Sequence, residues 1–301
     1  MSLLDGYVDR DVVKHFASLM ADMKPDNIRI VILGEDLRNN IEKYDLKEWL
    51  PAWVTVEDEL SLGMEVEDRS FVDKLIAFSG LEKSILTIKE KYLALPGTRS
   101  TLKEALEKGV DIRVVNDILG AMVVASRKRR NKVVYPIAGY EDEGLITAAG
   151  LAKAKTVGFR NFFVYNRHEQ TNAVVKAIAE KEKQVDGFII PLKVGLNTGT
   201  GAFSSIPLVY RKGVVISGYE PMEIMQSVWM LLNQKAEATP AVVFQRTKEA
   251  SDEIVNRARW MMEEVFESSD INLDDFGLVK GGGYRIRDKY RAFDVQNAGF
   301  D

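Results

Sequence analysis

The chain has 301 residues, of which 46% are hydrophobic and 29% charged, as in globular proteins that bury a core. This length fits two domains, since domains usually contain roughly 100–200 residues. The formal net charge of −4 provides no positive field to attract a nucleic-acid backbone, so general nucleic-acid binding is not expected. There is no cysteine, which excludes disulfides, thiolate metal sites and cysteine nucleophiles.

The chain begins MSLLD, without the basic and then apolar pattern of a signal peptide. No apolar run approaches the roughly 20 residues that span a bilayer. We therefore expect a cytoplasmic protein that does not contact membranes.

Short β-branched runs alternate with stretches of helical period, which predicts parallel sheets built from strand–helix–strand units. We expect an α/β fold with two similarly built, open, mostly parallel sheets flanked by helices. The first domain is expected at residues 1–126 and the second at 127–235. The predicted strands are 28–33, 53–56, 84–88 and 111–115 in the first domain, and 133–137, 162–165, 187–190 and 214–217 in the second.

Residues 236–301 are expected to form a C-terminal helical extension that packs back on the α/β domains. A helix begins near Ser251, and its apolar residues recur at helical spacing, which indicates a core stripe. Gly281–Gly283 predict a turn, with a phosphate-binding loop as the less favoured alternative.

The basic run at residues 127–132 follows an apolar stretch and precedes a predicted strand. Cations at a helix C-terminus offset the negative end of the helix dipole, so a solvated cap is the preferred interpretation. A partner or anion site is the alternative.

Five segments of the sequence have features in common with one protein family. They are LPGTR at 95–99, GYE at 139–141, DGFIIP at 186–191, GYEPMEIMQ at 218–226, and the stretch 277–294 with Arg287, Tyr290, Phe293 and Asp294. In this order the segments resemble the HypD family of hydrogenase maturation factors, over roughly residues 7–295.

The resemblance implies a scaffold on which iron with cyanide and carbon monoxide ligands is assembled together with partner proteins. The family's Cys-Gly-Thr-His motif falls on Gly34 to Leu37, and its Cys-Pro-Val-Cys motif falls on residues 62–65, which read Leu-Gly-Met-Glu. The cysteine-rich segment that binds a four-iron, four-sulfur cluster is expected to be absent. Because thiolates hold low-spin iron in this family, we expect no such cofactor here.

Ligands of open α/β sheets bind at the carboxyl ends of strands, so polar residues that follow the predicted strands are site candidates. The carboxylates could bind a cation or accept a proton, or could tie loops together. The histidine could shuttle protons or simply hydrogen-bond, and the lysine could neutralise an anion or lie on the surface. The candidates are Glu35, Asp36, Glu141, His168, Lys193 and Glu220.

Acidic residues around the lost thiol positions provide oxygen donors that suit magnesium or calcium, although a solvated acidic rim is the preferred interpretation. They are Glu35, Asp36, Glu65, Glu67 and Asp68. No metal site is therefore assigned.

Two functions compete. In the first, the chain is a HypD-like accessory or scaffold protein that has lost thiol-dependent iron chemistry and binds a protein partner, such as a maturation factor, or an assembly intermediate. In the second, it is a small-molecule-binding protein or enzyme that uses a cleft between its domains. Because a family resemblance does not transfer function once the site is replaced, the sequence leaves both open.

Overall fold

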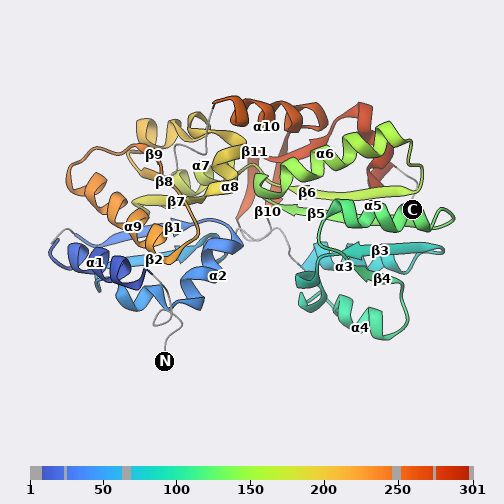
Figure 1. Ribbon diagram of the computed structural model, residues 1–301, viewed down its shortest axis with the longest axis horizontal. Coiled ribbons are helices and arrows are strands. Elements are labelled where there is room, and N and C mark those ends of the chain that lie inside the picture. Colours follow the sequence, from blue (N-terminus) through green and yellow to red (C-terminus); the bar gives the residue numbers. More distant parts are fainter. Residues whose placement is uncertain (1–8, 24–25, 63–68, 246–251, 274–275, 298–301) are drawn as a thin grey trace. The chain divides into compact units, whose positions relative to one another are not determined.

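The computed structural model describes residues 9–23, 26–62, 69–245, 252–273 and 276–297. The chain divides into two compact units, each built from two separate segments. Unit 1 contains Met1–Met64 and Thr171–Ala258, and unit 2 contains Glu65–Gln170 and Arg259–Asp301. Each unit has its own sheet (Figure 1).

Unit 1 has a five-stranded parallel sheet in the order β2-β1-β7-β8-β9. The chain runs from β1 to one neighbour, β2, and returns later to the other, β7, so the strand order reverses beside β1. Such a reversal opens a crevice at the carboxyl ends of the two strands, where ligands bind in open α/β sheets. The strands are β1 (Ile28–Ile32), β2 (Val54–Asp58), β7 (Gly187–Pro191), β8 (Gly213–Ser217) and β9 (Val242–Phe244).

Helices flank the sheet of unit 1, and the apolar faces of three of them form a core with the side chains of β1 and β8. Within this core the rings of Phe16 and Trp229 lie 5.8 Å apart. The helices are α1 (Arg10–Ala21), α2 (Glu35–Lys43), α7 (Thr171–Lys181), α8 (Leu192–Thr198) and α9 (Pro221–Ala236), and α10 (Asp252–Val265) begins in this unit.

Unit 2 has a four-stranded parallel sheet in the order β4-β3-β5-β6 and an antiparallel hairpin of β10 and β11. Residues of β6 alternate between two cores: Phe162 and Val164 face one, and Phe163 and Tyr165 face the other. The strands are β3 (Ser84–Ile88), β4 (Ile112–Val114), β5 (Lys132–Gly139), β6 (Phe162–His168), β10 (Phe266–Leu273) and β11 (Gly277–Ile286).

The helices of unit 2 cover both faces of its sheet. As the sequence predicts, the basic run follows a helix, because α5 ends at Arg127. The helices are α3 (Arg69–Ser79), α4 (Leu102–Glu107), α5 (Ile118–Arg127) and α6 (Glu141–Val157). In the described part of the chain no helix has the length and hydrophobicity needed to cross a membrane.

The α/β class and the two parallel sheets agree with the prediction, but the grouping of the strands differs. The expected boundaries near residues 126 and 235 do not coincide with the units, because β1, which also pairs with β2, pairs with β7 from the second half of the chain. Residues 242–244 of the predicted extension form the edge strand of unit 1. Buried strands have similar sequences whichever neighbour they pair with, so periodicity alone does not assign them to a sheet.

The C-terminal segment also differs from the predicted helical extension, since β10 and β11 follow α10. Gly281–Gly283 lie within β11 and do not form the predicted turn. The register of the hairpin shifts between Ser269 and Ile271, and opposite this irregularity Gly281 has a φ of 63° and donates its N–H to Asp270 Oδ1 (2.8 Å). The glycines therefore accommodate a bulge.

Candidate functional site

The six predicted site residues follow strands, as expected, but they belong to two different units. Glu141 and His168 lie in unit 2, at the ends of β5 and β6. The other four lie in unit 1, after β1, β7 and β8: Glu35, Asp36, Lys193 and Glu220. The six therefore form two sets, each of which has its own chemistry.

In unit 1, Asp36 and Lys193 meet because β1 and β7 are neighbours. Lys193 Nζ lies 3.3 Å from Asp36 Oδ2, and both side chains are about half exposed, at 55% and 54%. The lysine also lies 5.5 Å from the ring of Tyr219, whose hydroxyl accepts a hydrogen bond from the Lys193 N–H (3.1 Å). An exposed pair of this kind contributes little stability, and both charges remain accessible to solvent.

Glu220 starts a helix. It is the N-cap residue of α9, with Pro221 after it, and the Glu223 carboxylate accepts the Glu220 N–H at 3.0 Å in a capping box. This geometry supports the loop-tying interpretation of Glu220. Glu35 is the first residue of α2, where a carboxylate complements the helix dipole.

Glu59 is a buried acid at this edge of the sheet. It follows β2 and is only 4% exposed, and its Oε1 accepts the Gly34 N–H at 2.9 Å. Its Oε2 is buried without a hydrogen-bond partner among the described residues. Burial raises the pKa of this carboxyl from 4.5 to about 7. Glu59 belongs to the acidic run at residues 57–59, and the sequence pattern did not distinguish it from its half-buried neighbours.

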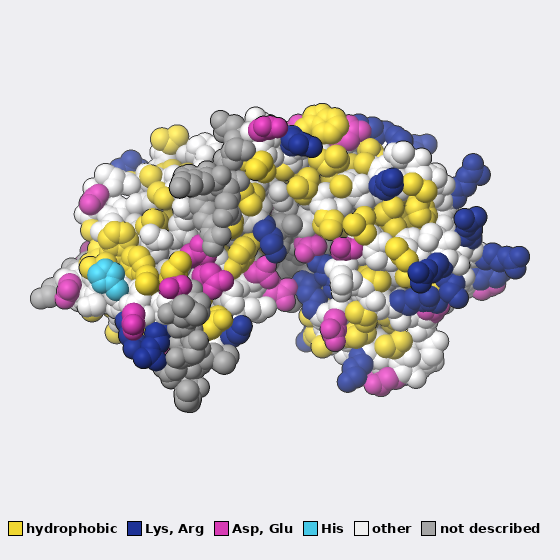
Figure 2. Space-filling model, in the orientation of Figure 1, with side chains coloured by type: hydrophobic (Ala, Val, Ile, Leu, Met, Phe, Trp, Pro, Cys, Tyr) yellow, Lys and Arg dark blue, Asp and Glu magenta, His cyan; other side chains and the backbone are white. Residues whose placement is uncertain are grey.

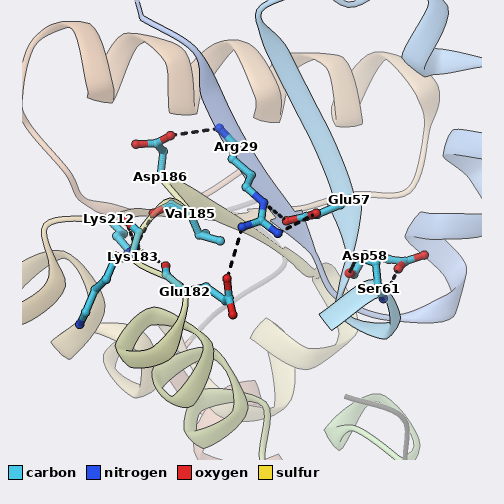
Figure 3. A network of polar contacts seen from close by, with 9 residues as sticks. All are labelled: Arg29, Glu57, Asp58, Ser61, Glu182, Lys183, Val185, Asp186 and Lys212. Atoms are coloured by element: carbon cyan, nitrogen blue, oxygen red, sulfur yellow. Dashed lines mark hydrogen bonds and ion pairs between the residues drawn. The ribbon is translucent and has the colours of Figure 1, made fainter. Parts of the chain in front are cut away.

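A second polar network of unit 1 joins β1, β2 and the end of α7 (Figure 3). Arg29 forms ion pairs with Glu57 and with Glu182, the latter at 3.4 Å, and its backbone N–H donates to Asp186 Oδ2 at 3.0 Å. The hydrogen bond with Glu57 raises the pKa of the guanidinium. Since Arg29 connects β1 to carboxylates of β2 and of the residues after α7, the network has the character of a structural tie.

Lys212 lies in the same network with its side chain buried. Its Nζ donates to the backbone carbonyls of Glu182 (3.0 Å), Lys183 (3.3 Å) and Val185, just beyond α7. Burial lowers the pKa of the ammonium group. A cation in this position complements the negative end of the helix dipole and holds the turn after α7, in which the Glu182 carbonyl also accepts the Val185 N–H.

In unit 2, Glu141 and His168 come together because Gly139 pairs with His168 in the β5–β6 ladder. Glu141 is 1% exposed and begins α6, and Tyr284 of β11 donates its hydroxyl to Glu141 Oε1 at 3.2 Å. Burial, together with this carboxylate, raises the pKa of the Tyr284 phenol. Glu141 therefore ties the hairpin to the end of the sheet.

His168 is also 1% exposed, and its Nε2 lies 2.8 Å from the carbonyl oxygen of Tyr140. The rings of Phe266 and Tyr284 lie 5.5 and 5.4 Å from the imidazole. Burial lowers the pKa of His168 from 6.5 to about 4, so the ring is neutral at neutral pH. A proton shuttle works best when its pKa is near the operating pH, and this environment does not provide that.

The described positions that resemble the family's Cys-Gly-Thr-His and Cys-Pro-Val-Cys motifs carry neither a thiol nor an imidazole. Gly34 has a φ of 88°, and a Cβ atom there would lie 2.8 Å from Pro191 Cγ. Leu37 is fully buried in the apolar core of unit 1. Leu62 ends a short 3₁₀ helix (Glu59–Leu62), and it has no donor atom in its side chain. Aliphatic side chains cannot replace soft thiolate ligands.

The acidic candidates Glu65, Glu67 and Asp68, and the matched positions Gly63 and Met64, lie outside the described residues. Within the described ranges, no three histidine or acidic side chains are placed to hold a metal ion together. The described part of unit 1 therefore provides no set of ligands for a magnesium or calcium ion at the acidic rim.

Comparison with known proteins identifies the family. The HypD family model, described as the hydrogenase formation hypA family, matches residues 11–300. A hydrogenase expression/formation protein of Methanocaldococcus jannaschii is 29% identical, over 90% of this chain and 76% of its own length. The hydrogenase maturation factor HypD of Rhizobium leguminosarum bv. viciae is 26% identical, over 97% and 78%. HypD of Escherichia coli is 27% identical, over 85% and 69%. The chain therefore belongs to the HypD family.

Proposed function

We propose that this protein is an accessory scaffold of hydrogenase maturation that binds a protein partner and does not hold iron through its own side chains. Family membership supports the pathway, since the matched relatives are named hydrogenase maturation or formation proteins. One observation supports the loss of iron chemistry. The position that resembles the family's first cysteine is a glycine with a φ of 88°, and the space for its side chain is filled by Pro191.

An exposed face of α5 supports partner binding. Leu119 and Val123 are 47% and 48% exposed, and residues four apart lie on the same face of a helix. The basic run begins at the last turn of this helix, and all of residues 126–130 are exposed. Figure 2 shows hydrophobic side chains over the part of unit 2 that carries α5 and α6, with Lys and Arg side chains gathered beyond them.

Apolar residues bordered by cations suit a partner surface with an apolar centre and acidic residues around it. The cations accelerate the encounter with the acidic partner, and the apolar face of α5 contributes the surface that is buried in the complex. This surface is independent of the lost thiol positions, since it lies in unit 2 and Gly34 lies in unit 1.

Two experiments test the proposal. In a strain that lacks its own HypD, expression of this chain should not restore hydrogenase activity, whereas the strain's own protein should. Restored activity would refute the loss of iron chemistry.

In a host that encodes this chain beside hydrogenase maturation proteins, the tagged protein should co-purify with one of them. The double variant Leu119→Glu, Val123→Glu should lose that partner while its far-UV circular dichroism stays unchanged, because both side chains are half exposed. Lys103→Glu, on the exposed face of α4, provides the matched control. Equal recovery of the partner by all three proteins would refute the assignment of the surface.

A further inference from the structure

The amino edge of the sheet of unit 2 carries a dense group of cations. Three loops precede strands there: residues 80–83 before β3, 128–131 before β5 and 158–161 before β6. With the end of α5 and the start of β5 they contain seven cationic residues, of which six are exposed and Lys132 is half-buried. Figure 2 shows Lys and Arg side chains gathered at this end of unit 2. We call this group the basic edge: Lys83, Arg127, Lys128, Arg129, Arg130, Lys132 and Arg160.

A helix cap accounts for only part of the basic edge. Cations offset the helix dipole within its last turn, and α5 ends at Arg127, with Lys128 as its C-cap residue. The two arginines that follow lie beyond the helix, and Lys83 and Arg160 belong to other loops. Like charges grouped on one edge repel one another, so the grouping favours a partner with negative charge.

Most of these cations have no carboxylate beside them. Lys83 forms an ion pair with Glu82 at 3.2 Å, and Glu82 is the only acidic residue in the three loops. The four residues 127–130 and Arg160 form no ion pair with a carboxylate in the described part of the chain. Their charges are therefore free to meet an acidic ligand from solution.

One side chain fixes the arrangement of the loops. Asn161 donates from Nδ2 to three carbonyl oxygens at 3.0, 3.2 and 3.1 Å, those of Ala125, Lys128 and Asn131. A backbone hydrogen bond of 2.8 Å from the Lys132 N–H joins the loop before β3 as well. The cationic side chains therefore extend from backbone positions that are fixed before a ligand binds, which lowers the entropic cost of binding.

The size of the basic edge suits a short extended peptide. Its strands are neighbours in the order β3-β5-β6. Since neighbouring strands lie about 4.8 Å apart, the three loops together span roughly 10 Å. An extended peptide advances about 3.3 Å per residue, so roughly three or four residues cross the edge, and the long arginine side chains reach further on both sides.

Carboxylates suit the basic edge better than nucleic acid does. Guanidinium groups bind carboxylates and phosphates alike through two parallel hydrogen bonds. Single-stranded nucleic acid also stacks its bases on aromatic rings, but Phe159, the one aromatic residue in these loops, is half-buried against Phe162 with the rings 6.3 Å apart. The net charge of −4 opposes a long phosphate backbone, whereas a short peptide meets only charges within a Debye length of about 8 Å.

We propose that the basic edge binds a short, extended segment of a protein partner that is rich in aspartate and glutamate. This deepens the proposed function, because it gives the chemistry of the segment that the partner presents beside the apolar face of α5. It rests on the proposed function only for the identity of the partner.

A fluorescein-labelled octaglutamate peptide tests the proposal in a fluorescence-anisotropy titration of the whole chain. The peptide has no apolar side chain, so the result depends neither on the face of α5 nor on hydrogenase activity, and either proposal can fail alone. The double variant Arg129→Glu, Arg130→Glu should bind the peptide at least about tenfold more weakly, since it replaces two cations by anions. Lys103→Glu, Lys280→Glu makes the same change in net charge at exposed positions of α4 and β11 outside the basic edge, and its affinity should be almost unchanged.

Equal losses in the two double variants would overturn the proposal, because binding would then follow net charge alone. Absence of binding at low salt would also overturn it, as would tighter binding of a thymidine octanucleotide or of vesicles of anionic phospholipid.

A third variant tests the fixed loops. Asn161→Ala keeps every charge and removes the hydrogen bonds that hold the α5–β5 connection, so it should weaken peptide binding by about threefold. Unchanged affinity in a folded Asn161→Ala would refute the role of the fixed loops. If this variant does not fold, the arginine variant still decides, because its two positions are exposed.

Discussion

Replacing Glu59 with glutamine should remove a pH-dependent loss of stability from unit 1. The folded-state pKa of Glu59, about 7, lies above its ordinary value of 4.5. Stability from the neutral carboxyl is therefore fully present below pH 4.5 and is lost as the pH rises to 7, because the unfolded chain releases the proton first. The two pKa values differ by about 2.5, and each pKa unit corresponds to about 1.4 kcal/mol, so the loss is about 3 kcal/mol.

In Glu59→Gln, the side-chain carbonyl can still accept the Gly34 N–H, and the group no longer titrates. The free energy of unfolding of the variant should therefore rise relative to wild type by about 3 kcal/mol between pH 4.5 and pH 8. Comparing the two proteins at each pH cancels the contributions of all other titrating groups.

Urea unfolding followed by tryptophan fluorescence is a suitable assay, because three of the four tryptophans lie in unit 1: Trp49, Trp53 and Trp229. Glu48→Gln is the matched control, since it makes the same substitution at an exposed position of unit 1. A difference between Glu59→Gln and wild type that stays constant to within about 0.5 kcal/mol would refute the argument from burial.

Three further predictions concern other described positions. The pKa of His168, about 4, lies below its ordinary value of 6.5, so the free energy of unfolding of unit 2 should fall by about 3 kcal/mol as the pH falls from 6.5 to 4. Hydrogen exchange of β5 and β6 should show this loss in the wild type but not in His168→Gln. Gly34→Ala should destabilise its unit by at least about 1 kcal/mol more than Gly109→Ala destabilises the other. Both glycines have a φ near 90°, but only at Gly34 would the added methyl group clash with a neighbouring side chain, that of Pro191. Equal losses of stability in urea unfolding would contradict this prediction. Lys212→Met should lower the free energy of unfolding of unit 1 by about 2 kcal/mol, since it removes the ammonium donor from the buried Val185 carbonyl. Exposed Lys183→Met should have almost no effect, and similar chemical denaturation curves for both variants would show that the cap is unimportant.

The secondary structure was largely predictable from the sequence because local patterns determine it. The β-branched run of β8 and the Glu-Pro-Met-Glu start of α9 are signals that a few neighbouring residues carry. The pairing of strands was not predictable, since β2 and β3 follow one another in the chain and yet join different sheets. Their apolar residues would suit either neighbour equally well.

The candidate site was predictable only in part, for a similar reason. Residues that follow strands could be read from the sequence, and this pattern found Asp36 and Lys193, which form an ion pair. By contrast, the partner of the Asn166 amide is a hairpin carbonyl that lies 118 residues later in the chain, which no local pattern reveals. Sequence position identifies polar residues at strand ends, but burial and long-range partners decide which of them are left with unpaired atoms.

The division of each unit into two chain segments affects how the protein emerges from the ribosome. Arg29 of β1 bonds to Asp186, 157 residues later, so the first strand of unit 1 must wait for most of the chain before one of its two neighbours exists. During that time all of unit 2 except its C-terminal segment is synthesised. Because contacts between distant residues slow folding and leave strand edges exposed, the nascent N-terminal segment is the part of this chain with the greatest need of protection by chaperones.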